Sequence, residues 1–141
     1  MATLDTILKQ IDLVFKDIEQ KRESAQGLLE NANRLSTIMY NLSDLWVTAK
    51  TNSDTAKLSY DEKFDEVFFE QKTQHKVSDE TAKAVARIES REFYSSYLTK
   101  EHLQRKLFAL RSDIDRKISV IQSYAAELRS QFAARKGGEP T

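Results

Sequence analysis

A heptad repeat runs through residues 4–49, which read LDTILKQIDLVFKDIEQKRESAQGLLENANRLSTIMYNLSDLWVTA. Counting alternately three and four residues gives fourteen positions, and thirteen of them are apolar. These positions are Leu4, Ile7, Ile11, Val14, Ile18, Lys21, Ala25, Leu28, Ala32, Leu35, Met39, Leu42, Trp46 and Ala49. A seam with a period of 3.5 residues is typical of a helix that coils around a partner helix. We therefore expect a single helix over residues 1–50, about 70 Å long, packed against long helices of its own chain or of another copy.

Strong helix breakers are rare in the rest of the chain. Apart from Gly27, every glycine and proline lies within the last five residues, and residues 28–136 contain neither. An ordinary β protein needs such residues at its turns, and the composition is rich in good helix formers. The sequence predicts an all-α fold, in which long heptad-patterned helices form an elongated helical bundle or coiled coil that oligomerisation completes.

Two polar stretches predict where the helices end. Residues 51–55 (TNSDT) compete for backbone hydrogen bonds and make good N-caps, so we expect a break there. Residues 51–78 then comprise this break, a short acidic and aromatic helix, and a basic loop over residues 72–76. Ser78 or Asp79 is expected to cap the next helix.

A long C-terminal helix is expected over residues 79–136. Its second half carries a seam with helical spacing, formed by Leu103, Leu107, Leu110, Ile114, Ile118, Ile121, Ala125, Leu128 and Phe132. The apolar spacing is irregular over residues 89–100, which indicates a kink or a change of partner. Residues 137–141 are expected to fray as a flexible tail.

Composition narrows the functional classes. The 141 residues carry 22 basic and 22 acidic side chains and no cysteine, which excludes thiol nucleophiles and sulfur-ligated metals. No apolar run is long enough to span a bilayer, and the N-terminus lacks the pattern of a signal peptide. We expect no membrane contact and a cytoplasmic location, which is the host cytoplasm if a phage encodes the protein.

No catalytic arrangement is apparent. His75 and His102 are too far apart to form a paired-ligand motif, and no glycine-rich phosphate loop is present. An acidic row at Glu62, Glu66 and Glu70 could attract a divalent ion, but a solvated helix face explains it better. We expect no enzymatic activity, no catalytic residue, no metal and no cofactor.

A basic stripe is the main candidate for binding. Lys83, Arg87 and Arg91 are spaced i, i+4, i+8 and so share one helix face, with Lys72 and Lys76 upstream and aromatic residues nearby. Cations beside aromatic rings suit single-stranded nucleic acid, which offers phosphates and unstacked bases. In the alternative interpretation, the stripe pairs with Glu80 and other acids on a solvated surface. The pI of 6.8 is low for a nucleic-acid domain, so binding would depend on an oligomer that gathers several stripes.

The C-terminal third resembles a known family. Residues 107–128 (LFALRSDIDRKISVIQSYAAEL) resemble the final helix of the UvsY family of recombination mediators from T-even phages, including the element Ile121-Gln122-Ser123 and a following aliphatic residue, Leu128. The resemblance extends over roughly residues 57–130. It implies contacts of Lys57 and Tyr60 with single-stranded DNA, although Ser59 stands where the family has a second basic residue.

The resemblance implies a non-enzymatic recombination accessory protein. Such a protein binds single-stranded DNA as a homo-oligomer and helps load a RecA-type recombinase on DNA coated by a single-strand-binding protein. The expected DNA contacts are Lys57, Tyr60, Lys72, Lys76, Lys83, Arg87 and Arg91. The expected oligomer contacts are Trp46, Leu107, Leu110, Ile114, Ile118, Ile121 and Leu128. The alternatives are a coiled-coil scaffold or adaptor with no nucleic-acid role, and a phage-encoded inhibitor of a host enzyme.

Overall fold

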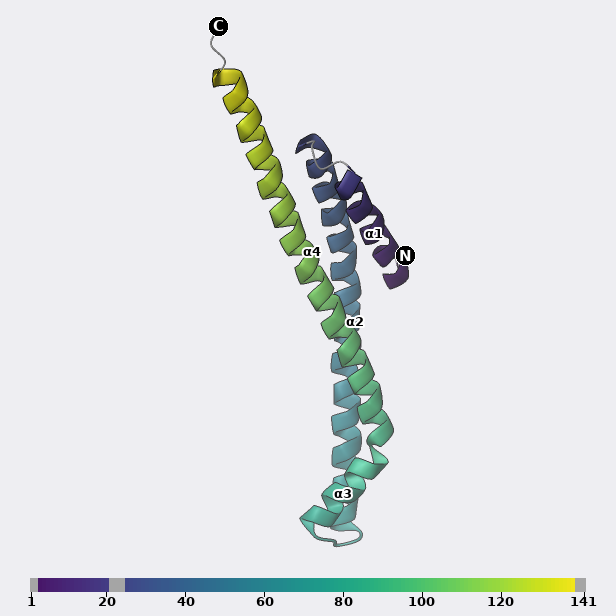
Figure 1. Ribbon diagram of the computed structural model, residues 1–141. Helices are drawn as coiled ribbons and strands as arrows, with labels where there is room; N and C mark the ends of the chain where they lie inside the picture. Colours follow the sequence, from purple (N-terminus) through teal and green to yellow (C-terminus); the bar gives the residue numbers. More distant parts are fainter. Residues whose placement is uncertain (1–2, 21–24, 139–141) are drawn as a thin grey trace. The chain divides into compact units, whose positions relative to one another are not determined.

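The computed structural model describes residues 3–20 and 25–138, and this part of the chain is helical with no strand (Figure 1). The all-α fold class is confirmed. The described helices are α1 (Leu4–Gln20), α2 (Ala25–Thr73), α3 (Asp79–Glu89) and α4 (Arg91–Gly138). The chain divides into two compact units, one formed by Met1–Leu45 with Phe108–Thr141 and the other by Trp46–Leu107. Helices α2 and α4 contribute residues to both units.

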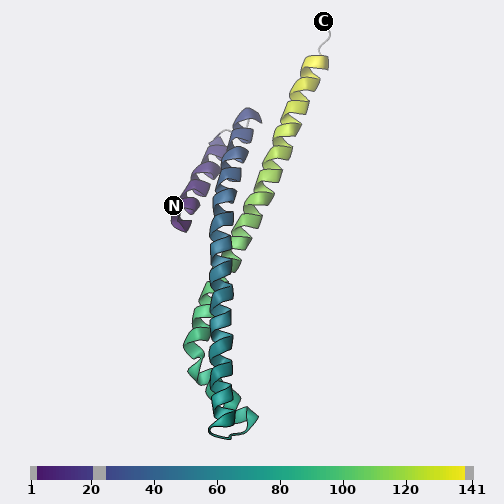
Figure 2. The same cartoon turned by 180° about the vertical axis from the view of Figure 1, so that it is seen from behind.

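In the first unit, α1 lies antiparallel to the beginning of α2 (Figure 1, Figure 2). Arg34 of α2 reaches the Asp17 carboxylate of α1 at 3.4 Å and donates a second hydrogen bond to Asn31 Oδ1 at 3.0 Å. The prediction of a single helix over residues 1–50 is therefore wrong, because two neighbouring segments of opposite direction form two helices. Lys21, the charged member of the seam, lies outside the described residues.

The apolar seams of α1, α2 and α4 form the core of the first unit. Its buried apolar side chains are Ile7, Ile11, Val14, Leu28, Ala32, Leu35, Ile38, Leu42, Ile114, Ile118, Ile121 and Ala125. Burial of one such Leu or Ile contributes about 1.5–3 kcal/mol, so the packed seams stabilise helices that would be marginal alone. A cation–π contact between Lys117 and the Phe15 ring, at 5.4 Å, joins α4 to α1 at the surface.

In the second unit, α2 continues through the polar stretch where a break was expected. That prediction is wrong, because the buried face of the helix passes through the stretch: Ala49, Ser53 and Ala56 are buried at i, i+4, i+7. The other polar residues of the stretch lie on the exposed face. Lys50 and Asp54 form an i, i+4 ion pair at 3.5 Å across it, which adds a little support to the helix.

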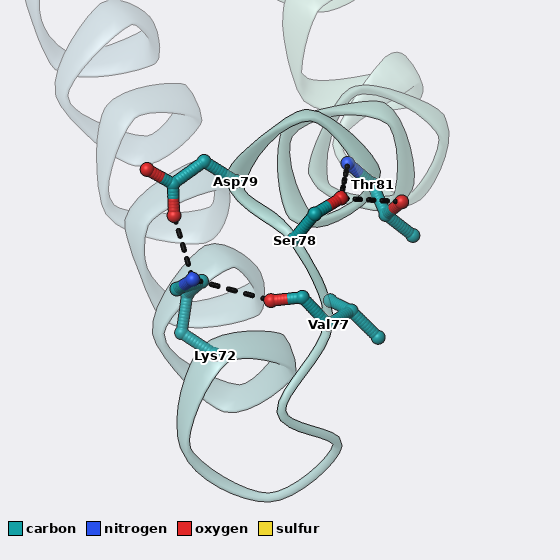
Figure 3. Close-up of polar contacts among 5 residues, drawn as sticks. All are labelled: Lys72, Val77, Ser78, Asp79 and Thr81. Atoms are coloured by element: carbon teal, nitrogen blue, oxygen red, sulfur yellow. Dashed lines mark hydrogen bonds and ion pairs between the residues drawn. The ribbon is translucent and has the colours of Figure 1, made fainter.

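The turn between α2 and α3 is closed by side chains, as Figure 3 shows. The Lys72 ammonium contacts the Asp79 carboxylate at 2.6 Å and donates to the Val77 carbonyl at 3.1 Å. Ser78 is the N-cap of α3, and its hydroxyl oxygen accepts the Thr81 amide hydrogen bond at 3.2 Å. These contacts place α3 at the end of α2, where the sequence had predicted the second break and a cap at Ser78 or Asp79.

The C-terminal segment is divided at Ser90, which lies within the region where a kink was expected. The prediction of one helix over residues 79–136 is wrong, because Ser90 has φ −95° and ψ 6° and so departs from helical geometry. Its hydroxyl donates to the Ala86 carbonyl, and its own carbonyl accepts from the Tyr94 amide at 3.0 Å. The break is therefore tight, and α4 starts directly after α3.

Candidate nucleic-acid interface

An open groove of about 400 Å³ lies within the second unit, lined by residues of α2, α3 and α4. Its lining residues are Tyr60, Arg87, Ile88, Arg91 and Tyr94. Two cations and two phenol rings are thus concentrated in one depression. Three of the seven residues that the sequence predicted for DNA contact line this groove, namely Tyr60, Arg87 and Arg91.

The position of the arginines follows from the spacing of small residues along α3. Ala82 and Ala86 share one face of α3, and they are completely buried, as is Ser90 at the C-cap. Each residue of the basic stripe directly follows one of these small residues and is exposed. A step of one residue turns the side chain by about 100° around the helix axis. The stripe therefore lies on the flank of the packed face, where Arg87 and Arg91 border the groove.

Aromatic rings form a continuous row between α2 and α4. The ring centroids of Phe64 and Tyr60 lie 6.1 Å apart, those of Tyr60 and Tyr94 5.1 Å, and those of Tyr94 and Tyr97 6.4 Å. All three pairs are tilted, which is a favourable geometry for aromatic rings at these distances. The row fixes the two groove tyrosines between neighbours on both sides, while Tyr94 remains 44% exposed.

Polar side chains on α4 follow the last ring of the aromatic row, Tyr97. Burial raises the pKa of the Tyr97 phenol, and its hydrogen bond to the Glu101 carboxylate raises that pKa further. Glu101 also forms an ion pair with Arg105 one turn later. The three residues follow i, i+4, i+8 spacing, so they share one face of α4.

The charges near the groove differ in how far they are neutralised. Within residues 3–20 and 25–138, neither Arg87 nor Arg91 forms an ion pair with a carboxylate. Lys72, in contrast, is engaged by Asp79, and this hydrogen bond and charge lower the pKa of the Asp79 carboxyl, with a smaller contribution from Lys83. The alternative in which the cations pair with nearby acids therefore describes Lys72 but does not describe the two arginines.

The remaining predicted DNA contacts do not line the groove. Lys57 is exposed on α2, one helical turn before Tyr60. Lys76 is exposed in the turn before α3, where its φ of 50° places it in the left-handed region that non-glycine residues seldom adopt. Lys57 is close enough in sequence to extend the surface of the groove along α2.

Tyr94 and Ile88 belong to the groove but were not among the predicted contacts. Tyr94 follows Arg91 by three residues, so the helical spacing that identified the arginines also places it on their side of the helix. Its contact with Tyr60 depends on how α4 packs against α2. The spacing of residues along one helix does not predict this packing. Ile88 is exposed and had no apolar seam to identify it.

The residues predicted to join copies of the chain are largely buried within one copy. Leu107, Ile114, Ile118 and Ile121 have buried side chains, so they are not exposed for contact with a second chain. The other three, Trp46, Leu110 and Leu128, are half-buried. Apolar surface on α4 remains exposed at Val120 and Tyr124.

The described residues show neither a metal-binding cluster nor a membrane-spanning helix. No group of three or more His, Asp or Glu side chains there is arranged to hold a metal ion, and Glu62, Glu66 and Glu70 are all exposed. None of the described helices has both the length and the hydropathy needed to cross a membrane.

Comparison of the chain with protein-family models, with curated proteins and with solved structures found no match.

Proposed function

We propose that the chain binds single-stranded DNA without sequence preference, through the groove formed by Tyr60, Arg87, Ile88, Arg91 and Tyr94. The observation that carries this proposal is the combination of two unneutralised arginines with two tyrosine rings in one open depression. Arginine binds phosphate in a planar, bidentate manner. Aromatic faces bind unstacked bases of any sequence, which duplex DNA keeps inside its helix.

The charge of the chain limits the affinity of a single groove. The net charge is zero, and two arginines can neutralise about two phosphates. For single strands, each neutralised phosphate contributes about −0.7 to the slope of log K against log salt, so one groove gives a slope of about −1.4. A homo-oligomer would place several grooves on one strand and raise the overall affinity by linking binding events.

A role as a recombination accessory protein is the wider form of the proposal. It rests on the resemblance of residues 107–128 to the UvsY family and would make a RecA-type recombinase and a single-strand-binding protein the further partners. Loading a recombinase requires DNA binding and self-association but no chemistry. The groove supports the first of these requirements only.

The second candidate function is that of a scaffold or adaptor. It is supported by apolar side chains on the exposed surface of α4, since Val120 is 64% and Tyr124 44% exposed. Exposed apolar patches on helices are typical of protein contacts. This candidate leaves the two unneutralised arginines beside the tyrosines without a role, so we rank it second.

A charge-reversal experiment separates the two candidates. The triple variant Lys83→Glu, Arg87→Glu and Arg91→Glu is expected to lose binding to a labelled single-stranded oligonucleotide while its circular dichroism keeps the helical signal. A matched control, Lys9→Glu, Lys106→Glu and Arg129→Glu, makes the same change in net charge at exposed positions outside the groove. Equal losses in both variants would show that only the overall charge matters and would remove the groove from the proposal.

A further inference from the structure

We propose that Tyr94 is a platform for one unpaired nucleobase, so that the groove recognises bases as well as phosphates. The inference rests on the proposed function, because it concerns the same groove. It adds a residue, and a chemical group of the ligand, that the basic stripe does not identify. The stripe alone would hold any flexible polyanion.

The Tyr94 side chain is exposed inside the groove. The ring is 44% exposed and lies among the two arginines and Ile88. Two of its neighbours are themselves aromatic, with Tyr60 at 5.1 Å and Tyr97 at 6.4 Å between centroids. A base that stacks on Tyr94 would therefore extend an existing row of rings.

The Tyr94 ring already lies between aromatic neighbours before any ligand arrives. Tyr60 lies on one side of it and Tyr97 on the other. Tyr60 is fixed on its other side by Phe64 at 6.1 Å. A ring that is already ordered loses little conformational entropy on binding, and this loss is a main cost of recognition.

The two arginines and the Tyr94 ring line the same groove. Arg87 lies in the last turn of α3, Arg91 begins α4 after the break at Ser90, and Tyr94 follows Arg91 by one turn of α4. A strand whose base stacks on Tyr94 thus passes its phosphates beside both guanidinium groups. Ile88, between the two arginines in sequence, provides an apolar contact for the edge of the base or the sugar.

The test compares oligo(dT) with an oligomer of the same length made of abasic sites, which has the same phosphates and no bases. Fluorescence anisotropy of the labelled strands measures both affinities on the full chain. We expect the wild-type protein to bind oligo(dT) more tightly by roughly fivefold to a hundredfold, the range of one base–aromatic stack. In Tyr94→Ala, the affinity for oligo(dT) should fall to that for the abasic strand, while the abasic affinity stays unchanged.

Matched variants distinguish the possible outcomes. Tyr124→Ala removes a ring of the same exposure on the same helix, outside the groove, and should behave as wild type. Arg87→Gln with Arg91→Gln should weaken both strands together. Equal affinity of the wild-type protein for both strands would overturn the platform but leave phosphate binding intact, as would a preference for oligo(dT) that survives in Tyr94→Ala. Absence of binding to either strand would overturn the proposed function itself.

Discussion

Tyr97 lies next to the groove tyrosine Tyr94, and its phenol has a raised pKa. Burial and the nearby Glu101 carboxylate raise its pKa above the usual value of 10.0. Between pH 10 and the raised pKa, the folded chain keeps a proton that the unfolded chain has lost. The stability that this proton contributes is present below pH 10 and is lost as the pH rises through the folded pKa.

This shift predicts a titration result. Phenolate absorbance at alkaline pH should show one tyrosine that ionises later than the others, and Tyr97→Phe should remove that late component. Glu101→Gln should move it to lower pH, because the carboxylate no longer opposes the phenolate charge. A late component that persists in Tyr97→Phe would show that another tyrosine carries the shift.

At this scale the sequence identified the cations more readily than the rings. Arg87 and Arg91 follow from i, i+4 spacing, which is local. Tyr60 was expected from the resemblance, and its contact with Tyr94 joins residues of different helices. Such a contact depends on tertiary packing, so local spacing could place Tyr94 on a face but could not assign its neighbour.

Helix boundaries were the least predictable feature at the scale of elements. The heptad phase was right, since all of its described positions are buried or half-buried. Two antiparallel helices that pack against each other carry the same apolar period as one long helix, so the pattern did not reveal the reversal between α1 and α2. The polar stretch at residues 51–55 led to the prediction of a helix break that is absent. Its one buried position, Ser53, is small and polar, so the stretch shows no apolar residue that would indicate a buried helix face.

The continuity of α2 predicts the cost of a proline. Asn52 is exposed in the helix interior, so Asn52→Pro should lower the free energy of unfolding by about 3 kcal/mol. Asn52→Ala should instead raise it by a few tenths of a kcal/mol, because alanine is the better helix former. Chemical denaturation followed by circular dichroism measures both. A proline variant as stable as wild type would show that the helix breaks at this stretch after all.

On the scale of the whole molecule, charge is balanced rather than concentrated. The second unit holds eleven basic and eleven acidic residues, so its affinity for nucleic acid cannot arise from an overall positive field. Any affinity for nucleic acid therefore has to arise from the local positions of individual charged side chains. The unneutralised arginines in the groove meet this requirement, while Lys72 is used to close the turn before α3.

The apolar seams of the sequence do not distinguish packing within one chain from packing between chains. The long apolar rows suggested that partner chains were needed to cover them, yet much of the C-terminal seam is buried within one chain. The pattern of residues is the same whether helices of one chain or of several chains meet. Only the packing of α4 in the first unit shows that the seam already has partners.

The most direct test of the account is binding of the wild-type chain to a fluorescent oligo(dT), with a duplex of equal length for comparison. Anisotropy would be measured at salt concentrations of about 50 and about 200 mM, since phosphate contacts weaken as salt rises. We predict tighter binding to the single strand at both concentrations, and weaker binding of each at the higher salt. Absence of binding at the lower concentration, or a preference for the duplex, would contradict the central claim that the tyrosine and arginine groove receives single-stranded DNA.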